Sequence, residues 1–158
     1  TGIIWKPCTP ARKSSLPRAH WATTPRAYIQ ETCLQCHKDK TEAQMNKVLD
    51  SMNAHYNGKL REAEASMGQM FIAFRQANDA GVDPAVIKQA QDLHSVAHTN
   101  WEWWTASNGS WFHNMPQAKE SLAKSVAASQ KATKLLRDAV AAKVAAQAQP
   151  QAQQTAQK

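Results

Sequence analysis

A long helical pattern over residues 41–80 leaves few folds open to this chain. Apolar side chains recur there at spacings of three, four or seven residues, the period of one helix face. They are Met45, Val48, Met52, Tyr56, Ala63, Met67, Met70, Phe74 and Ala77. At about 1.5 Å per residue, the pattern predicts a single helix about 60 Å long. Thr41 can cap its N-terminus, and Gly81 can adopt the left-handed conformation that ends a helix.

Two more helices are predicted after this one. Asp83 and Pro84 stand in the favoured order of a capping residue followed by proline at the first helical position. The second stripe comprises Val86, Ala90, Leu93, Ala97, Trp101 and Trp104, and the third comprises Leu122, Val126, Ser129, Ala132, Leu135, Leu136, Ala139 and Val140. A break at residues 107–110 and a compact loop at 111–116 separate these two helices. With only 5 glycines and few Phe, Tyr, Ile and Val residues, the composition favours an all-α fold over a sandwich or barrel.

The chain divides into three parts by pattern. Residues 1–40 are rich in proline and lack a sustained helical period, so we expect an irregular wrapping segment. Residues 41–146 are predicted to form the long-helix bundle, and the glutamine- and alanine-rich residues 147–158 to be disordered. Pro7, Pro10 and nearby basic residues interrupt any signal-peptide pattern, so we expect either that a signal was removed or that the chain is a piece of something longer. No stretch approaches the roughly 20 apolar residues that span a membrane.

The charge balance is basic, with 19 Lys and Arg against 12 Asp and Glu, which gives a net charge of +7. Residues 1–30 contain five basic side chains and no carboxylate, whereas the helices mix both signs. Because no basic helix face carries interleaved aromatic residues, the sequence argues against nucleic-acid binding. The same positive field suits a small anion.

The predicted helices have a modest supply of bulky apolar residues, so their exposed sides favour a partner. Alanine-rich seams let helices approach closely, and heptad-like spacing favours shallow crossing angles. We therefore expect docking on another chain or on an identical copy. An ordinary soluble bundle is the alternative.

The strongest short motif is Cys-Leu-Gln-Cys-His at residues 33–37. Two thiols three positions apart can add across the two vinyl groups of protoporphyrin, and the adjacent imidazole can reach the iron. The motif therefore predicts one covalent haem c on Cys33 and Cys36, with His37 as the proximal ligand. A zinc site that also uses Cys8 and a histidine is one alternative. A thioredoxin-like redox pair is another, although it expects a βαβ pattern that is absent. Otherwise Cys8 is expected to be an inert buried thiol.

An electron-transfer haem c needs a sixth ligand, commonly His or Met. His20 lies in a constrained loop seventeen residues before His37, and His113 lies at the helix-breaking junction, so both are candidate iron ligands. His94 and His98 are one helical turn apart and could chelate a metal, but no third ligand is evident. The methionines follow the helical stripe and are better explained as core residues.

Together these features resemble the C-terminal portion of the ammonia-forming cytochrome c nitrite reductases, which are pentahaem enzymes. The similarity runs from about Arg18 through Leu136. It includes the His-containing loop before the haem motif, the long helices, an Ala-x-x-Asn-Trp-Glu-Trp stretch at residues 97–103 and a Gly-x-x-x-His-Asn segment at residues 109–114. Met115 departs from the family pattern, and the segment before residue 13 matches nothing in it.

The resemblance implies specific roles for the candidate residues. Cys33 and Cys36 would carry the last haem of the family, with His37 as its proximal ligand. His20 and His113 would be distal ligands to two neighbouring haems whose own motifs lie outside this chain. The lysine-ligated catalytic haem and the nitrite-pocket residues have no counterpart in the sequence, so no catalytic residue is assigned.

The implied function is that of a haem c-containing part of a multihaem nitrite reductase, which reduces nitrite to ammonia with six electrons. The chain would relay electrons, as a C-terminal fragment or a separate subunit, beside another haem-bearing chain or the missing N-terminal portion. A redox donor, a homo-oligomer contact through the long helices and a periplasmic location are also expected. Hydroxylamine and sulfite are alternative substrates. A stand-alone monohaem electron-transfer protein and a zinc-stabilised helical adaptor are the competing functions.

Overall fold

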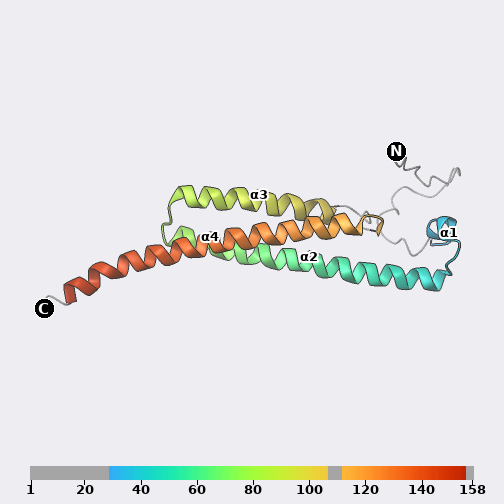
Figure 1. Cartoon of the computed structure of the whole chain (residues 1–158), viewed down its shortest axis with the longest axis horizontal. Helices are drawn as coiled ribbons and strands as arrows, with labels where there is room; N and C mark the ends of the chain where they lie inside the picture. Colours follow the sequence, from blue (N-terminus) through green and yellow to red (C-terminus); the bar gives the residue numbers. More distant parts are fainter. Residues whose placement is uncertain (1–28, 107–111, 156–158) are drawn as a thin grey trace. The chain divides into compact units, whose positions relative to one another are not determined.

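A computed structural model describes residues 29–106 and 112–155. Within these ranges it contains helices and no strand: α1 (Cys33–Cys36), α2 (Glu42–Asp79), α3 (Pro84–Ala106) and α4 (Met115–Thr155) (Figure 1). The all-α prediction with three long helices is confirmed. The chain divides into two compact units, Thr1–Asn53 and Ala54–Lys158, with the boundary inside α2. Cys8 and His20 lie outside the described residues.

The starts of α2 and α3 follow the predicted caps. The Thr41 hydroxyl accepts a hydrogen bond from the Gln44 backbone N–H at 3.2 Å, and the Gln44 side-chain oxygen accepts one from the Thr41 N–H at 2.9 Å. This reciprocal pair is a capping box. At the start of α3, the Asp83 carboxylate accepts a hydrogen bond from the Ala85 N–H at 2.8 Å, and Pro84 occupies the first helical position. The caps satisfy backbone donors that have no partner within the helix.

The end of α2 is set by Gly81, whose φ is +66°. The Gly81 N–H bonds to the Asn78 carbonyl and the Val82 N–H bonds to the Ala77 carbonyl, both at 3.0 Å. This pair of bonds is the Schellman motif, which satisfies two of the last carbonyls of a helix. Glycine is favoured there because a side chain at positive φ meets the following carbonyl.

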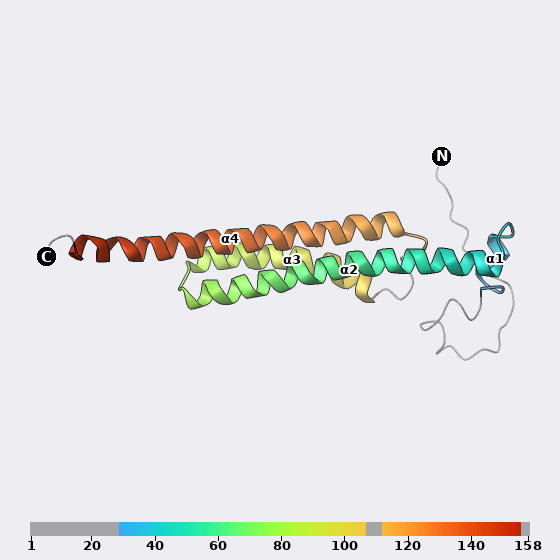
Figure 2. The same cartoon turned by 90° about the horizontal axis from the view of Figure 1, so that it is seen from below.

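The second unit packs α3 and α4 against the part of α2 that follows Ala54. In it α2 and α4 run in the same direction and α3 runs antiparallel to both (Figure 1, Figure 2). Its buried cluster comprises Met67, Met70, Ala73, Ala77, Val82, Ala90, Ala97, Ala128, Ala132 and Leu136. Six of these side chains are alanine, which lets the helix backbones approach closely.

The buried stripe of α2 differs from the predicted one near its start. Val48, which the pattern assigned to the stripe, is 42% exposed, whereas Leu49 is 4% exposed. Met45, Leu49 and Tyr56 are all buried. Positions 45, 49 and 56 are four and eleven residues apart, close to one and three turns of 3.6 residues, so they share a face. Spacings of three and four both satisfy a helical pattern, which is why Val48 was assigned wrongly.

The seam between α3 and α4 contains small polar side chains. Ser121 on α4 donates a hydrogen bond to the side-chain oxygen of Asn100 on α3 at 2.9 Å. Ser125, Ser129 and Thr133 follow at four-residue spacing and are buried. Thr133 donates to the Ser129 carbonyl one turn earlier at 2.8 Å, which keeps its hydroxyl satisfied inside the helix.

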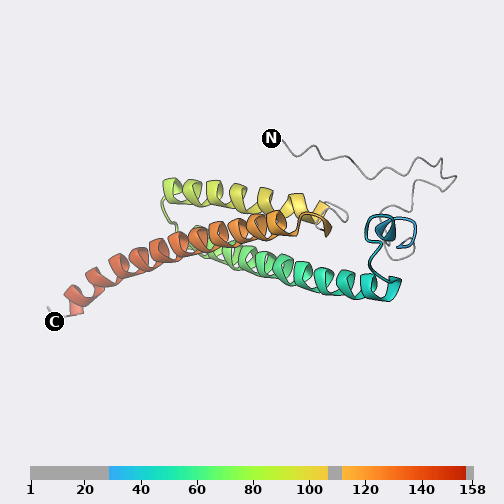
Figure 3. The ribbon, with the colours of Figure 1, turned by 45° about the vertical axis from the view of Figure 1, so that its right-hand side comes forward.

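The last third of α4 extends beyond the turn that joins α2 to α3 (Figure 3). Residues 141–148 are all exposed, and the helix continues to Thr155. Residues 147–155, which fall in the segment predicted to be disordered, belong to α4. Alanine and glutamine both have high helix propensity, so the same composition supports a solvated helix. None of the described helices is long and apolar enough to cross a membrane.

A buried tyrosine makes a hydrogen bond to the C-terminal turn of α3. Tyr56 on α2 is 6% exposed and donates a hydrogen bond to the backbone carbonyl of Trp104, at an oxygen–oxygen distance of 2.5 Å. Trp104 is itself 3% exposed. Its carbonyl is among the last four of α3, which find no donor within the helix. The sequence placed both residues in the apolar stripes but did not indicate this polar contact.

Candidate haem attachment site

The predicted attachment motif forms one tight turn. Cys33 and Cys36 are the first and last residues of α1, and His37 is its C-cap. The His37 N–H bonds to the Cys33 carbonyl at 2.9 Å, which closes the turn. Cys33 is half-buried, Cys36 and His37 are exposed, and no disulfide joins the two sulfurs. Two thiols and an imidazole are thus presented from five consecutive residues.

The turn fits a covalently bound porphyrin. Helix α1 contains no buried residue, and its N-cap Thr32 makes no side-chain capping bond. A single helical turn is marginal in water unless something packs on it. Leu34 in this turn is half-exposed, and a thiol pair with an adjacent imidazole is the set of residues that binds haem c.

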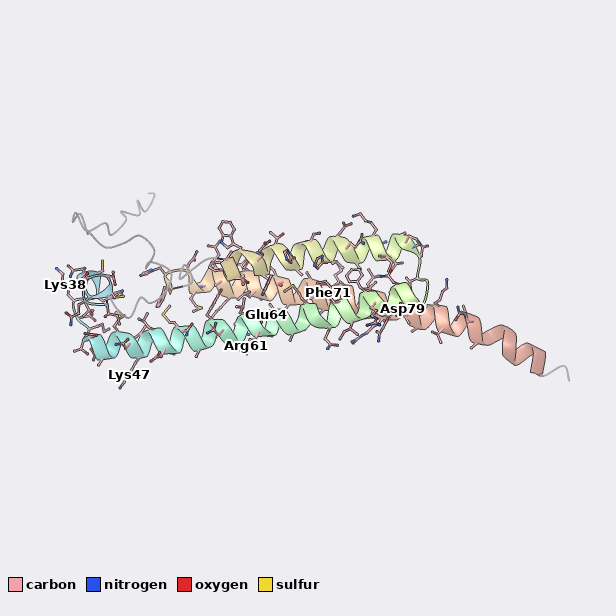
Figure 4. All side chains as sticks on the ribbon, turned by 180° about the vertical axis from the view of Figure 1, so that it is seen from behind. Lys38, Lys47, Arg61, Glu64, Phe71 and Asp79 are labelled. Atoms are coloured by element: carbon pink, nitrogen blue, oxygen red, sulfur yellow. The ribbon has the colours of Figure 1, made fainter. Side chains whose placement is uncertain are left out.

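A charged pair follows the attachment turn. The Lys40 ammonium lies 2.6 Å from the Asp39 carboxylate. The hydrogen bond from Lys40 lowers the pKa of Asp39, and a backbone hydrogen bond and the nearby His37 act in the same direction. Lys38 extends from the same loop (Figure 4). Lys38 and the ion pair of Lys40 with Asp39 thus directly follow the turn.

Two side-chain amides form hydrogen bonds around this turn. The sequence did not indicate these bonds. The Gln35 amide donates to the Gln30 carbonyl at 3.0 Å, and the Gln30 amide donates to the Glu42 carboxylate at 2.9 Å. The Leu34 N–H bonds to the Ile29 carbonyl at 2.9 Å, and Ile29 is 1% exposed. Neither contact leaves a sequence signal, because Gln35 in the Cys-x-x-Cys-His spacer bonds to a backbone carbonyl, and Gln30 before the motif bonds to a residue twelve positions away.

His113 lies in the second unit, exposed on the short connection before α4. Its neighbour Asn114 donates from its side chain to Gln117 at 2.6 Å, and the Asn114 carbonyl accepts the Ala118 N–H at 3.0 Å. These bonds hold the residue after His113 at the helix start. The imidazole of His113 is therefore accessible next to the hydrogen-bonded start of α4.

The structure groups Cys33, Cys36 and His37 on one turn, whereas His20 is outside the described residues.

His94 and His98 lie in an aromatic seam between α2 and α3. Phe71 extends from α2 toward α3 (Figure 4), with its ring centroid 5.3 Å from that of His94. His94 lies 5.6 Å from His98, which lies 5.7 Å from Trp101. The Nε2 atom of His94 is buried without a hydrogen-bond partner, and burial lowers the pKa of this histidine, with a smaller contribution from His98.

The contacts found in this seam are contacts between rings, and one carboxylate lies beside it. Glu102 lies beside His98, with an oxygen–nitrogen distance of 3.4 Å. Even so, within residues 29–106 and 112–155 no three His, Cys, Asp or Glu side chains are grouped so that they could hold a metal ion. The zinc alternative invokes Cys8, which is outside these ranges.

Comparison with known proteins agrees with the chemistry of the turn. The cytochrome c552 family matches residues 7–158. The cytochrome c nitrite reductase subunit NrfA of Nitratidesulfovibrio vulgaris is 33% identical over 129 residues, which cover 77% of this chain and 24% of that protein. Cytochrome c-552 of Parabacteroides distasonis is 28% identical over 94 residues, which cover 60% of this chain and 19% of that protein.

The chain thus spans about a quarter or less of the length of these relatives. The resemblance to the cytochrome c nitrite reductases is confirmed, and it extends over most of the chain. A match over residues 7–158, together with the haem attachment turn, shows that this chain belongs to the cytochrome c552 family.

Proposed function

We propose that the chain is a haem c-containing part of a multihaem nitrite reductase. One observation carries the proposal: Cys33, Cys36 and His37 lie on a single accessible turn whose residues are not buried by the protein. Membership of a cytochrome c family supports the cofactor, and a relative named as a nitrite reductase subunit supports the activity. The six-electron reduction of nitrite to ammonia is therefore the reaction to which this chain would contribute.

Each residue of the turn has a defined task in this proposal. The thiols of Cys33 and Cys36 would each add across one vinyl group: the S–H bond and the π bond of the vinyl group break, a carbon–sulfur and a carbon–hydrogen bond form, and no atom is lost. His37 would hold the iron through a ring nitrogen as the proximal ligand. Bound haem supplies reversible one-electron exchange, which is the chemistry of a relay.

His113 and His20 are proposed as distal ligands to haems held outside this chain. The exposed imidazole of His113, on a junction ordered by Asn114, supports its role. His20 is proposed from the family resemblance alone. No residue is assigned to bond breaking at nitrite, so the chain acts as a relay and a source of ligands.

The partners proposed are the remainder of the reductase, a redox donor and a second copy that contacts the long helices. Large apolar side chains exposed on α2 and α3 support the last of these: Phe71 is 53% and Trp103 is 68% exposed. Two open hollows also lie between α2 and α4: one is lined by Ala65, Ser66 and Arg137 among others, and the other by His55, Leu122 and Ala127 among others. A periplasmic location is proposed because covalent haem attachment is completed there.

Haem content and intact mass test the attachment. The full chain is produced with the c-type maturation machinery, and haem is measured as the pyridine haemochrome. We expect one haem per chain, its loss when Cys33 and Cys36 are both changed to serine, and its retention in the control Cys8→Ser. Colourless wild-type protein would refute the proposal, and bound zinc in such material would support the helical adaptor.

A second measurement tests the relay role against the stand-alone carrier. In the full assembly, His113→Ala should change the absorption spectrum of a haem that is attached to another chain or segment, whereas the exposed His55→Ala should not. An unchanged spectrum for His113→Ala contradicts the ligand assignment. An isolated 17.5 kDa chain with one haem and two histidine ligands of its own would favour the carrier.

A further inference from the structure

We infer that Gln35 and Gln30 are positioning residues that hold the attachment turn in shape before a porphyrin is bound. The inference rests on the proposed function, because it assumes that residues 33–37 bind haem. It goes beyond that function by assigning a role to two side chains that neither bond to the porphyrin nor ligate its iron.

The turn needs such support because its own helix is too short to be stable. Helix α1 has four residues, buries none of them and has no side-chain N-cap. Initiating a helix orders several residues for a single hydrogen bond, so an isolated turn is unfavourable. Only interactions from outside α1 can keep Cys33, Cys36 and His37 in one arrangement.

Two glutamine side chains supply these interactions. The Gln35 amide reaches back to the Gln30 carbonyl at 3.0 Å and so bridges the segment that leads into the turn. The Gln30 amide then bonds to the Glu42 carboxylate at 2.9 Å, at the start of α2. Helix α2 is itself held by its capping box, so the turn is connected to a stable helix start.

The backbone bonds of the turn depend on the same bridge. The Leu34 N–H bonds to the Ile29 carbonyl, and the His37 N–H bonds to the Cys33 carbonyl, each at 2.9 Å. Ile29 is almost fully buried and anchors the segment before the turn. If Gln35 loses its amide, the bridge opens and both backbone N–H groups should exchange faster with water.

The test measures amide hydrogen exchange at Leu34 and His37 in the full chain before haem attachment. Gln35→Met keeps the side-chain length and removes the donor. Gln76→Met is the matched control, since Gln76 is an exposed α2 glutamine for which the structure records no side-chain hydrogen bond. We expect exchange to accelerate roughly two- to tenfold in Gln35→Met, the range that one hydrogen bond provides, and to stay unchanged in Gln76→Met.

Haem loading in the same variants separates this inference from the proposed function. At equal expression, the haem-loaded fraction should fall in Gln35→Met and, to a smaller extent, in Gln30→Met, which keeps the carbonyl acceptor for Gln35. If the wild type loads haem but Gln35→Met matches it in exchange and loading, the positioning role is overturned and the proposed function stands. If the wild type loads no haem, both are overturned.

Discussion

Replacing Tyr56 by phenylalanine removes one hydroxyl and leaves the ring in place. That hydroxyl donates to the Trp104 carbonyl at the end of α3, and both residues are almost fully buried. Water cannot readily replace the lost donor, so the carbonyl is left unsatisfied. A buried group in this state costs about 1–3 kcal/mol of folding free energy. In a chain of this size, each kcal/mol lowers the melting temperature by roughly 2–4 °C.

Urea unfolding followed by circular dichroism at neutral pH measures this cost, with wild type and variant in the same haem-loading state. A Tyr56→Phe protein with the wild-type free energy of unfolding would refute the reasoning, because the carbonyl would then have another donor. Glu64→Gln is the control, since it removes a nearby charge but keeps the hydroxyl.

Alkaline unfolding provides an independent check of the same contact. Burial raises the pKa of Tyr56 above its ordinary value of 10.0, and the charge of Glu64 raises it further. The folded state therefore holds the phenolic proton more tightly than the unfolded state does. The associated stability is complete below the unfolded pKa and is lost as pH rises through the folded one. Tyr56→Phe should lose less stability than the wild type in this window.

Two further predictions concern the helix junction and the aromatic seam. Gly81→Ala should destabilise the protein by about 1–2 kcal/mol, because φ is +66° there. Gly68→Ala inside α2 should instead stabilise the protein by about 0.5–1 kcal/mol. Alanine is the better helix former, and nothing lies within 4 Å of the added carbon. Thermal melts of both variants decide this, and equal shifts would contradict it. The lowered pKa of His94 means that its stability contribution is present above its ordinary value of 6.5 and is lost as pH falls through the folded value. In His94→Leu, the urea midpoint should therefore depend less on pH between about pH 7 and 5 than it does in the wild type. An equal pH dependence in both proteins would argue against a buried neutral imidazole.

The existence of the three long helices, the starts of α2 and α3 and the end of α2 were predictable because they depend on local chemistry. The capping box at Thr41, the Asp83-Pro84 start and the left-handed Gly81 each involve residues within a few positions of one another. The attachment turn was predictable for the same reason, since Cys33 through His37 are contiguous. Choices between adjacent positions were less secure, and Val48 was assigned to the core in place of Leu49.

Contacts between distant parts of the chain required the folded molecule. The bond from Tyr56 to Trp104 joins residues 48 positions apart, and the edge-on contact of Phe71 with His94 joins two helices. Neither contact can be predicted from the spacing of apolar residues, because that spacing indicates which residues are buried but not which of their polar atoms form hydrogen bonds or which rings are in contact. The brace formed by Gln30 and Gln35 belongs to the same class. Local spacing therefore determined the helices and the motif of residues 33–37, and three-dimensional packing decided which polar groups hold them in place.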